Sequence, residues 1–174
     1  TNNGGALYIE RADTTIDDCT FDDDDATGSD GGAIYFVSGE EDFTLSNSTF
    51  TGHDAVEGGA LYLDADNSYT TTLTLSDLTF DDCDTTTTGG AVHITEFDTV
   101  TLTDLWIDNS STVGTGGAIY MDSLGDADLQ GLFVCDNTAA SGAGLYLLDA
   151  SGTVTIQNSV FVENGATTTG GGLY

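Results

Sequence analysis

The chain has 174 residues, of which 30 are acidic and one is basic, so its formal net charge is −29. This charge repels a phosphate backbone and excludes nucleic-acid binding through basic contacts. No window approaches 18 consecutive apolar residues, so we expect no membrane insertion by this segment, while 39% hydrophobic residues are enough to fill the core of one domain.

A Gly-Gly-Ala-aliphatic motif recurs along the whole chain and degrades in its last two copies. Its copies begin at residues 4, 31, 58, 89, 116, 142 and 170, which are 26 to 31 residues apart. Each copy leads into an alternating run such as Leu61-Tyr62-Leu63, and the Gly-Gly pair suits a tight corner that needs a positive φ. The first element predicted in every unit is therefore a short strand after a glycine corner.

Two further apolar segments follow in each unit, and a connector rich in Thr, Gly and Asp closes it. The second segment alternates, as in Leu73-Thr74-Leu75, and the third carries one apolar residue five positions later, such as Phe80. No stretch has a helical period. The repeat predicts a right-handed parallel β-helix of about six turns, three short strands per turn, in which residues 1–174 form a single segment.

Alternation within the first strand indicates which side chains face solvent. In Leu61-Tyr62-Leu63-Asp64 the Tyr series ends in a charge, so the Leu series fills the core and the Tyr series points outward. The outward column comprises Tyr8, Tyr35, Tyr62, His93, Tyr120, Tyr146 and Tyr174. By the same parity we expect an adjoining exposed column of Ala6, Ala33, Ala60, Ala91 and Ala118. The rings either stabilise adjacent turns or form an interaction strip for glycans or another rod.

Acidic residues gather in two dense clusters, one of Asp22, Asp23, Asp24 and Asp25 and one of Asp81, Asp82 and Asp84. One interpretation is a solvated acidic surface suited to salty or calcium-rich surroundings. The other is a Ca²⁺ site made by carboxylates of stacked turns, because hard cations prefer six to eight oxygen ligands. The sequence requires no cofactor, and Ca²⁺ is its one candidate.

The remaining polar motifs point to structure rather than to chemistry. Cys19, Cys83 and Cys135 fall in turns one, three and five, too far apart for a disulfide. His53 follows a glycine, as in β-helical polygalacturonases, but the chain has no Lys to contact a substrate, so we expect no enzymatic activity. Its repeat position is variable and holds Asp24 and Cys83 in other turns, so we expect a surface His. A second outward column, mostly Thr, runs along the middle strand; such arrays occur on ice-binding proteins, but Thr also suits any exposed strand.

Two motifs together carry a family resemblance. The Gly-Gly-Ala-[Ile/Leu/Val] motif is intact five times, and Phe161-Val162-Glu163-Asn164 supplies a downstream Phe-x-x-Asn. This combination resembles the repeats of polymorphic outer-membrane proteins, which are β-helical passengers of autotransporters. The resemblance covers the whole chain and implies secretion and a role in adhesion or in a surface stalk.

We therefore expect an extracellular, cell-surface structural rod segment of a secreted or surface-anchored fibre or adhesin. The alternatives are a glycan-binding module that uses the Tyr column and, third, a polysaccharide-cleaving enzyme. Neither end of the sequence shows a polar capping segment, so the expected partners are copies of the chain or neighbouring repeats, with glycans as further candidates.

Overall fold

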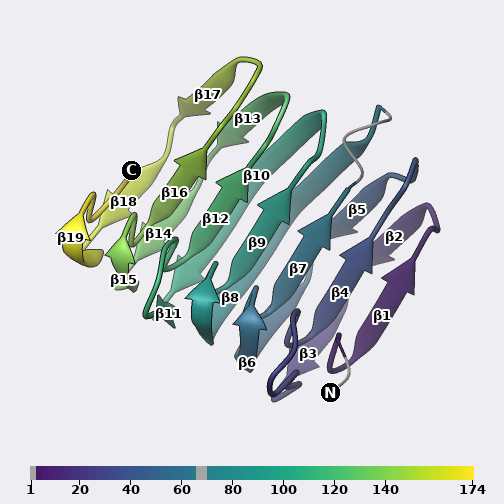
Figure 1. Cartoon of the computed structure of the whole chain (residues 1–174), viewed down its shortest axis with the longest axis horizontal. Helices are drawn as coiled ribbons and strands as arrows, with labels where there is room; N and C mark the ends of the chain where they lie inside the picture. The colour runs from purple at the N-terminus through teal and green to yellow at the C-terminus, as the bar shows by residue number, and fades with distance from the viewer. Residues whose placement is uncertain (1–2, 66–69) are drawn as a thin grey trace.

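The computed structural model describes residues 3–65 and 70–174. Within these residues every regular element is a β-strand, and the strands wind around one axis (Figure 1). In that view the near strands rise, the far strands descend and the chain advances from right to left, so the coil is right-handed. The described part of the chain contains no helix with the length and apolar character that a membrane crossing needs. The predicted parallel β-helix is confirmed.

The strand after each glycine corner belongs to a six-stranded parallel sheet. Its members pair in exact repeat register, so that Tyr35 lies beside Tyr8 and Tyr62. The strands are β1 (Leu7–Glu10), β4 (Ile34–Val37), β7 (Leu61–Asp64), β9 (Val92–Thr95), β12 (Ile119–Asp122) and β16 (Leu145–Leu148).

A 13-stranded sheet forms the other sides of the coil, and its longest strands bend through the corners. The second segment of each turn lies in β2 (Thr14–Asp17), β5 (Phe43–Ser46), β8 (Thr72–Thr88), β10 (Thr99–Asp108), β13 (Asp126–Gln130) and β17 (Val154–Gln157). The third segment lies in β3 (Thr20–Asp22), β6 (Thr49–Glu57), β14 (Phe133–Cys135) and β18 (Val160–Val162), and in the later parts of β8 and β10, which contain both segments.

The connector that closes each unit forms a fourth short segment, which the sequence did not predict. It occupies the ends of β6 and β8, then β11 (Ser111–Thr112), β15 (Thr138–Ser141) and β19 (Gly165–Thr169). These segments are rich in Thr and small residues and lack a clear apolar alternation, so only their pairing with neighbouring turns reveals them as strands.

Corners between the segments use the left-handed backbone region. Asp77 and Asp104, which join the second segment to the third, have φ values of 54° and 53°. Among the described residues, 14 non-glycine residues have positive φ, and ten of these are Asp or Asn. Short polar side chains tolerate this region because they bond to the local backbone. The excess of Asp over Glu therefore has a backbone cause as well as an electrostatic consequence.

The Gly-Gly corner behaves as the sequence predicts. Gly58 has a φ of 60°, and Gly59 lies so close to the next turn that a Cβ would overlap the carbonyl oxygen of Gly90. The first glycine thus supplies the backbone conformation and the second supplies the space.

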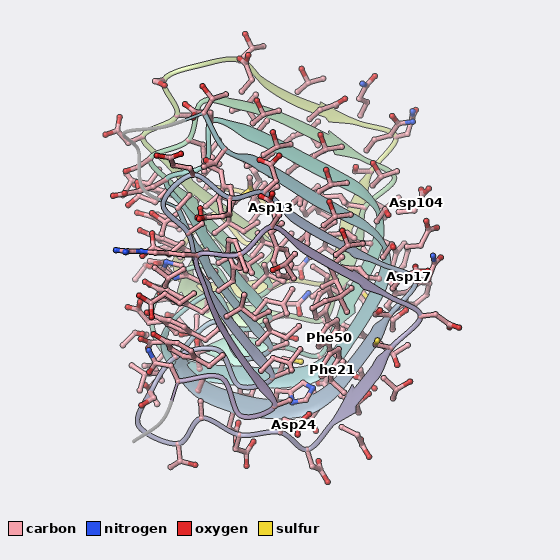
Figure 2. The ribbon with its side chains drawn as sticks, turned by 90° about the vertical axis from the view of Figure 1, so that its right-hand side faces the viewer. Asp13, Asp17, Phe21, Asp24, Phe50 and Asp104 are labelled. Carbon is pink, nitrogen blue, oxygen red and sulfur yellow. The ribbon has the colours of Figure 1, made fainter. Side chains whose placement is uncertain are left out.

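Inward-pointing columns of like residues fill the coil. The rings of Phe21, Phe50 and Phe80 stack at centroid distances of 4.8 and 4.9 Å. Figure 2, which looks along the coil from its N-terminal end, shows Phe21 and Phe50 inside and Asp17 and Asp104 at the periphery. Each inward column repeats once per turn, so the core is a continuous stack rather than a single cluster.

The predicted exposed alanine column is wrong for the inner turns. Ala33, Ala60, Ala91 and Ala118 are fully buried, and the residue after each, such as Ile34, is buried as well. Two consecutive residues point inward because each Ala still belongs to the corner, and the alternation begins only with the strand. No apolar strip therefore widens the Tyr column.

Candidate functional site

Seven aromatic rings form one column on the outer surface of the six-stranded sheet. Consecutive rings are stacked, with centroid separations between 4.8 and 5.5 Å. Parallel register places them there, because one residue of each strand occupies the same position as its neighbour in the next turn. The predicted ladder of Tyr8, Tyr35, Tyr62, His93, Tyr120, Tyr146 and Tyr174 is confirmed as a geometric column.

Stacking on both sides leaves only the ring edges and hydroxyl groups of the five inner rings for solvent. Tyr8 and Tyr174 at the two ends of the column are about half exposed, whereas Tyr35, Tyr62 and Tyr120 are largely covered. Burial raises the pKa of Tyr62 and, with Asp122 beside it, raises the pKa of Tyr120 to about 12. A sugar ring binds an aromatic side chain through its face, and the inner faces of this column already touch other rings.

His93 lies in the column but not on an exposed strip. Its side chain is 6% exposed, and Nδ1 is 2.9 Å from Oγ1 of Thr88. Burial lowers the His93 pKa to about 4, while the charge of Asp122 acts in the opposite direction. The imidazole is therefore neutral at pH 7 and serves as one more flat ring between Tyr62 and Tyr120.

The two acidic clusters meet on one side of the coil. A surface hollow of about 430 Å³ is lined by Asp23, Asp25, Gly52, Asp54, Asp82 and Asp84. Asp22, Asp24 and Asp81 do not line it. Asp54 was missed by the sequence analysis, although it pairs in register with Asp84 and its amide donates to Asp25. Burial, followed by the charges of Asp25 and Asp84, raises the Asp54 pKa.

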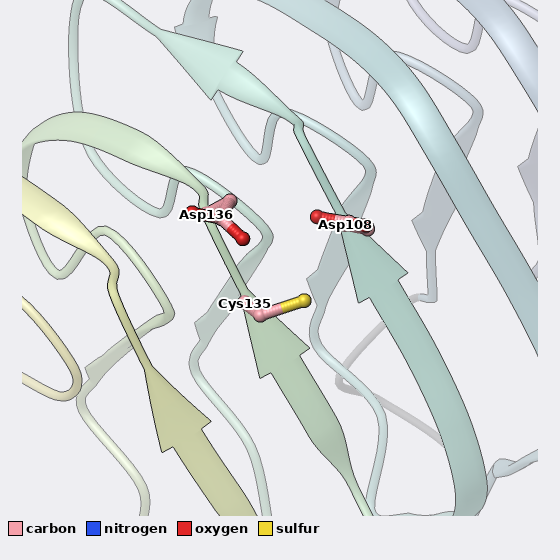
Figure 3. Close-up of side chains that lie close together, drawn as sticks. All are labelled: Asp108, Cys135 and Asp136. Carbon is pink, nitrogen blue, oxygen red and sulfur yellow. The ribbon is translucent and has the colours of Figure 1, made fainter.

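A different group brings potential metal ligands closest together within the described residues. The ligand atoms of Asp108, Cys135 and Asp136 lie within 4.8 Å of one another at the ends of β10 and β14 (Figure 3). Burial and the adjacent Asp108 raise the Cys135 pKa to about 12, so the thiol is protonated at neutral pH. Cys19, Cys83 and Cys135 are all free thiols.

His53 is not the surface residue that the sequence predicted. It is fully buried, and its Nδ1 lies 3.1 Å from the amide nitrogen and 2.9 Å from the carbonyl oxygen of Asp24. The same column contains Asn137, whose side-chain amide donates to the carbonyls of Cys135 and Ile107. The position of the Asn in Phe-x-x-Asn therefore points inward and bonds to the backbone at a bend.

Comparison with known proteins identifies one partial relative. The "probable outer membrane protein pmp6" of Chlamydia pneumoniae is 42% identical over 78 residues, which cover 40% of this chain and 6% of that protein. Part of this chain is homologous to a polymorphic outer-membrane protein. The predicted resemblance is thereby confirmed over that part. No family model and no solved structure matches the chain.

Proposed function

We propose that the chain is a structural rod segment of a secreted or surface-anchored fibre or adhesin. The observation that carries the proposal is the coil itself, whose turns stack in parallel register around one continuous core. At ~4.8 Å per turn, six turns extend the rod by about 29 Å. Homology to an outer-membrane protein supports a surface location.

Two other functions have weaker support. A glycan-binding module based on the Tyr column would need accessible ring faces, and the inner rings are stacked on each other. A polysaccharide-cleaving enzyme would need a proton donor or acceptor in contact with substrate. The imidazole that suggested this chemistry, that of His53, is buried in the coil. We therefore also propose that the segment has no enzymatic activity.

Surface labelling tests the proposal. Antibodies raised against the folded chain should stain intact cells that express the full-length protein, and proteinase K applied outside the cells should abolish the staining. An antibody to a cytosolic protein is the matched control and should stain only permeabilised cells. Staining by the chain-specific antibody only after permeabilisation would contradict a surface role.

A further inference from the structure

A second aromatic pair lies on the 13-stranded sheet, away from the six-stranded sheet that carries the Tyr column. Trp106 of β10 and Phe133 of β14 are register partners on adjacent turns. Their rings stack at a centroid distance of 4.4 Å with an interplanar angle of 26°. Trp106, the only Trp of the chain, is 48% exposed. A half-exposed Trp in the middle of a regular coil has no role in filling the core.

Among the described residues, only one face of the indole is stacked on another ring. Phe133 covers the face toward the following turn, while the register partner on the preceding turn is Thr79. Thr79 continues into Thr49 and Thr20, and all three are exposed. Because these side chains are short, they form a low row beside the ring. The free face of Trp106 is therefore directed along the coil axis toward these three threonine side chains, which we call the threonine shelf.

Four acidic residues flank this row and form its carboxylate frame. Asp108 and Asp81 follow Trp106 and Thr79 by two residues and are register partners, so they lie about 6.6 Å farther along the strands. Asp104 and Asp77 precede Trp106 and Thr79 at the left-handed corners, where both side chains are exposed. The chain's single basic side chain, Arg11, is three turns away in the first turn, or about 14 Å along the axis at ~4.8 Å per turn. No cationic side chain of the protein is available to this frame.

We propose that the open face of Trp106 and its carboxylate frame bind an organic cation, namely an Arg or Lys side chain from a basic segment of a partner protein. An indole face attracts cations more strongly than other aromatic rings, and a guanidinium group can stack on it while donating to carboxylates. The net charge of −29 draws such a segment toward the surface. This function goes beyond the proposed rod, which needs no ligand.

Peptide binding tests the site. A blocked, fluorescently labelled Arg-Gly-Arg peptide is titrated with the whole chain at 0.15 M NaCl and followed by anisotropy, with the matched Gln-Gly-Gln peptide as the neutral probe. The Arg peptide should bind, and its unlabelled form should change the fluorescence of Trp106. The Gln peptide should bind at least tenfold more weakly.

Three variants separate a specific site from diffuse charge. Trp106→Leu leaves the net charge unchanged and should weaken Arg-peptide binding about three- to tenfold. Asp81→Asn, on the turn that carries Thr79, should weaken it about threefold, whereas Asp128→Asn, an equal charge change on exposed β13, should have less than half that effect. Circular dichroism checks that each variant keeps its fold.

Other results would overturn the proposal. Equal affinity of Trp106→Leu and the original chain would mean that overall charge alone attracts the peptide. Tighter binding of a neutral hexasaccharide than of the Arg peptide would make the shelf a sugar site. A Trp fluorescence shift that depends on protein concentration and not on peptide would make it a contact between copies of the chain.

Discussion

The Tyr column and the Trp106–Phe133 pair are both outward aromatic columns in parallel register, yet their environments differ. Seven rings in succession close each other's faces in the first, whereas two rings end beside threonines in the second. In a coil, the access of solvent to a ring depends on its neighbours along the axis as much as on its inward or outward direction. A repeated ring is therefore structural, and an interrupted row leaves a face free for a ligand.

The largest expected effect comes from removing a ring inside the Tyr column. Tyr62→Ser should lower the free energy of unfolding by about 2–3 kcal/mol, because it removes a largely covered ring and two stacking contacts. Trp106→Ser, which loses one stacking contact at a half-exposed position, should cost about 1 kcal/mol. Urea denaturation of both variants measures the difference. Equal losses of unfolding free energy would mean that ring stacking stabilises the two columns to the same extent.

His93 allows the closed column to be tested by pH. Its folded pKa of about 4 lies below the ordinary value of 6.5, so the unfolded chain takes up the proton first. The contribution of His93 to the free energy of unfolding is complete above pH 6.5 and is lost as the pH falls toward 4. At pH 5 the loss is about 2 kcal/mol relative to pH 7.5.

The variant His93→Tyr restores the column's usual residue and removes this titration. Its stability relative to the original chain should rise by about 2 kcal/mol between pH 7.5 and pH 5, while the contribution of the carboxylates cancels in the comparison. Thermal unfolding of both proteins at the two pH values provides the measurement. A relative stability that does not change with pH would show that His93 is not buried as a neutral ring.

The repeat explains why so much of the fold could be predicted. Gly58 and Gly59 mark a corner and Leu61 to Leu63 alternate, and both patterns recur often enough to define the turn length, the columns and the inward face. Prediction failed where alternation crosses a corner, as at Ala60, and where an inward residue is polar, as at His53. Strand periodicity describes straight segments and is not valid through a left-handed residue.

The sites were less predictable than the fold. Asp54 lines the acidic hollow because its turn aligns with those of Asp25 and Asp84. The repeat spacing in the sequence already contained this alignment. No sequence pattern pointed to Trp106, because the proposed role of its indole depends on the absence of a ring at Thr79 on the preceding turn. A repeat predicts what is shared between turns, and a binding site depends on what differs.

Salt separates ring stacking from carboxylate repulsion. Raising NaCl from 0.02 to 0.5 M should increase the melting temperature by about 2–4 °C, equivalent to ~1 kcal/mol, because screening weakens repulsion among stacked carboxylates. The same increase is expected in Tyr62→Ser, since stacking does not depend on salt. CaCl₂ at equal ionic strength should act like NaCl. A larger effect of Ca²⁺, removed by Asp54→Asn, would indicate chelation in the acidic hollow.

The smallest expected change in stability comes from closing the open face. Thr79→Tyr places a third ring beneath Trp106 and makes the row resemble the Tyr column, which should add no more than about 0.5 kcal/mol to stability. The same change should lower affinity for the Arg peptide at least threefold, because the added ring occupies the face that the cation uses. Thr20→Tyr, two turns farther along the same row, is the matched control and should leave the affinity unchanged. Undiminished binding by Thr79→Tyr would show that the cation does not lie on the free face of Trp106. The difference between a column closed by stacking and a column with a free ring face would then not explain binding.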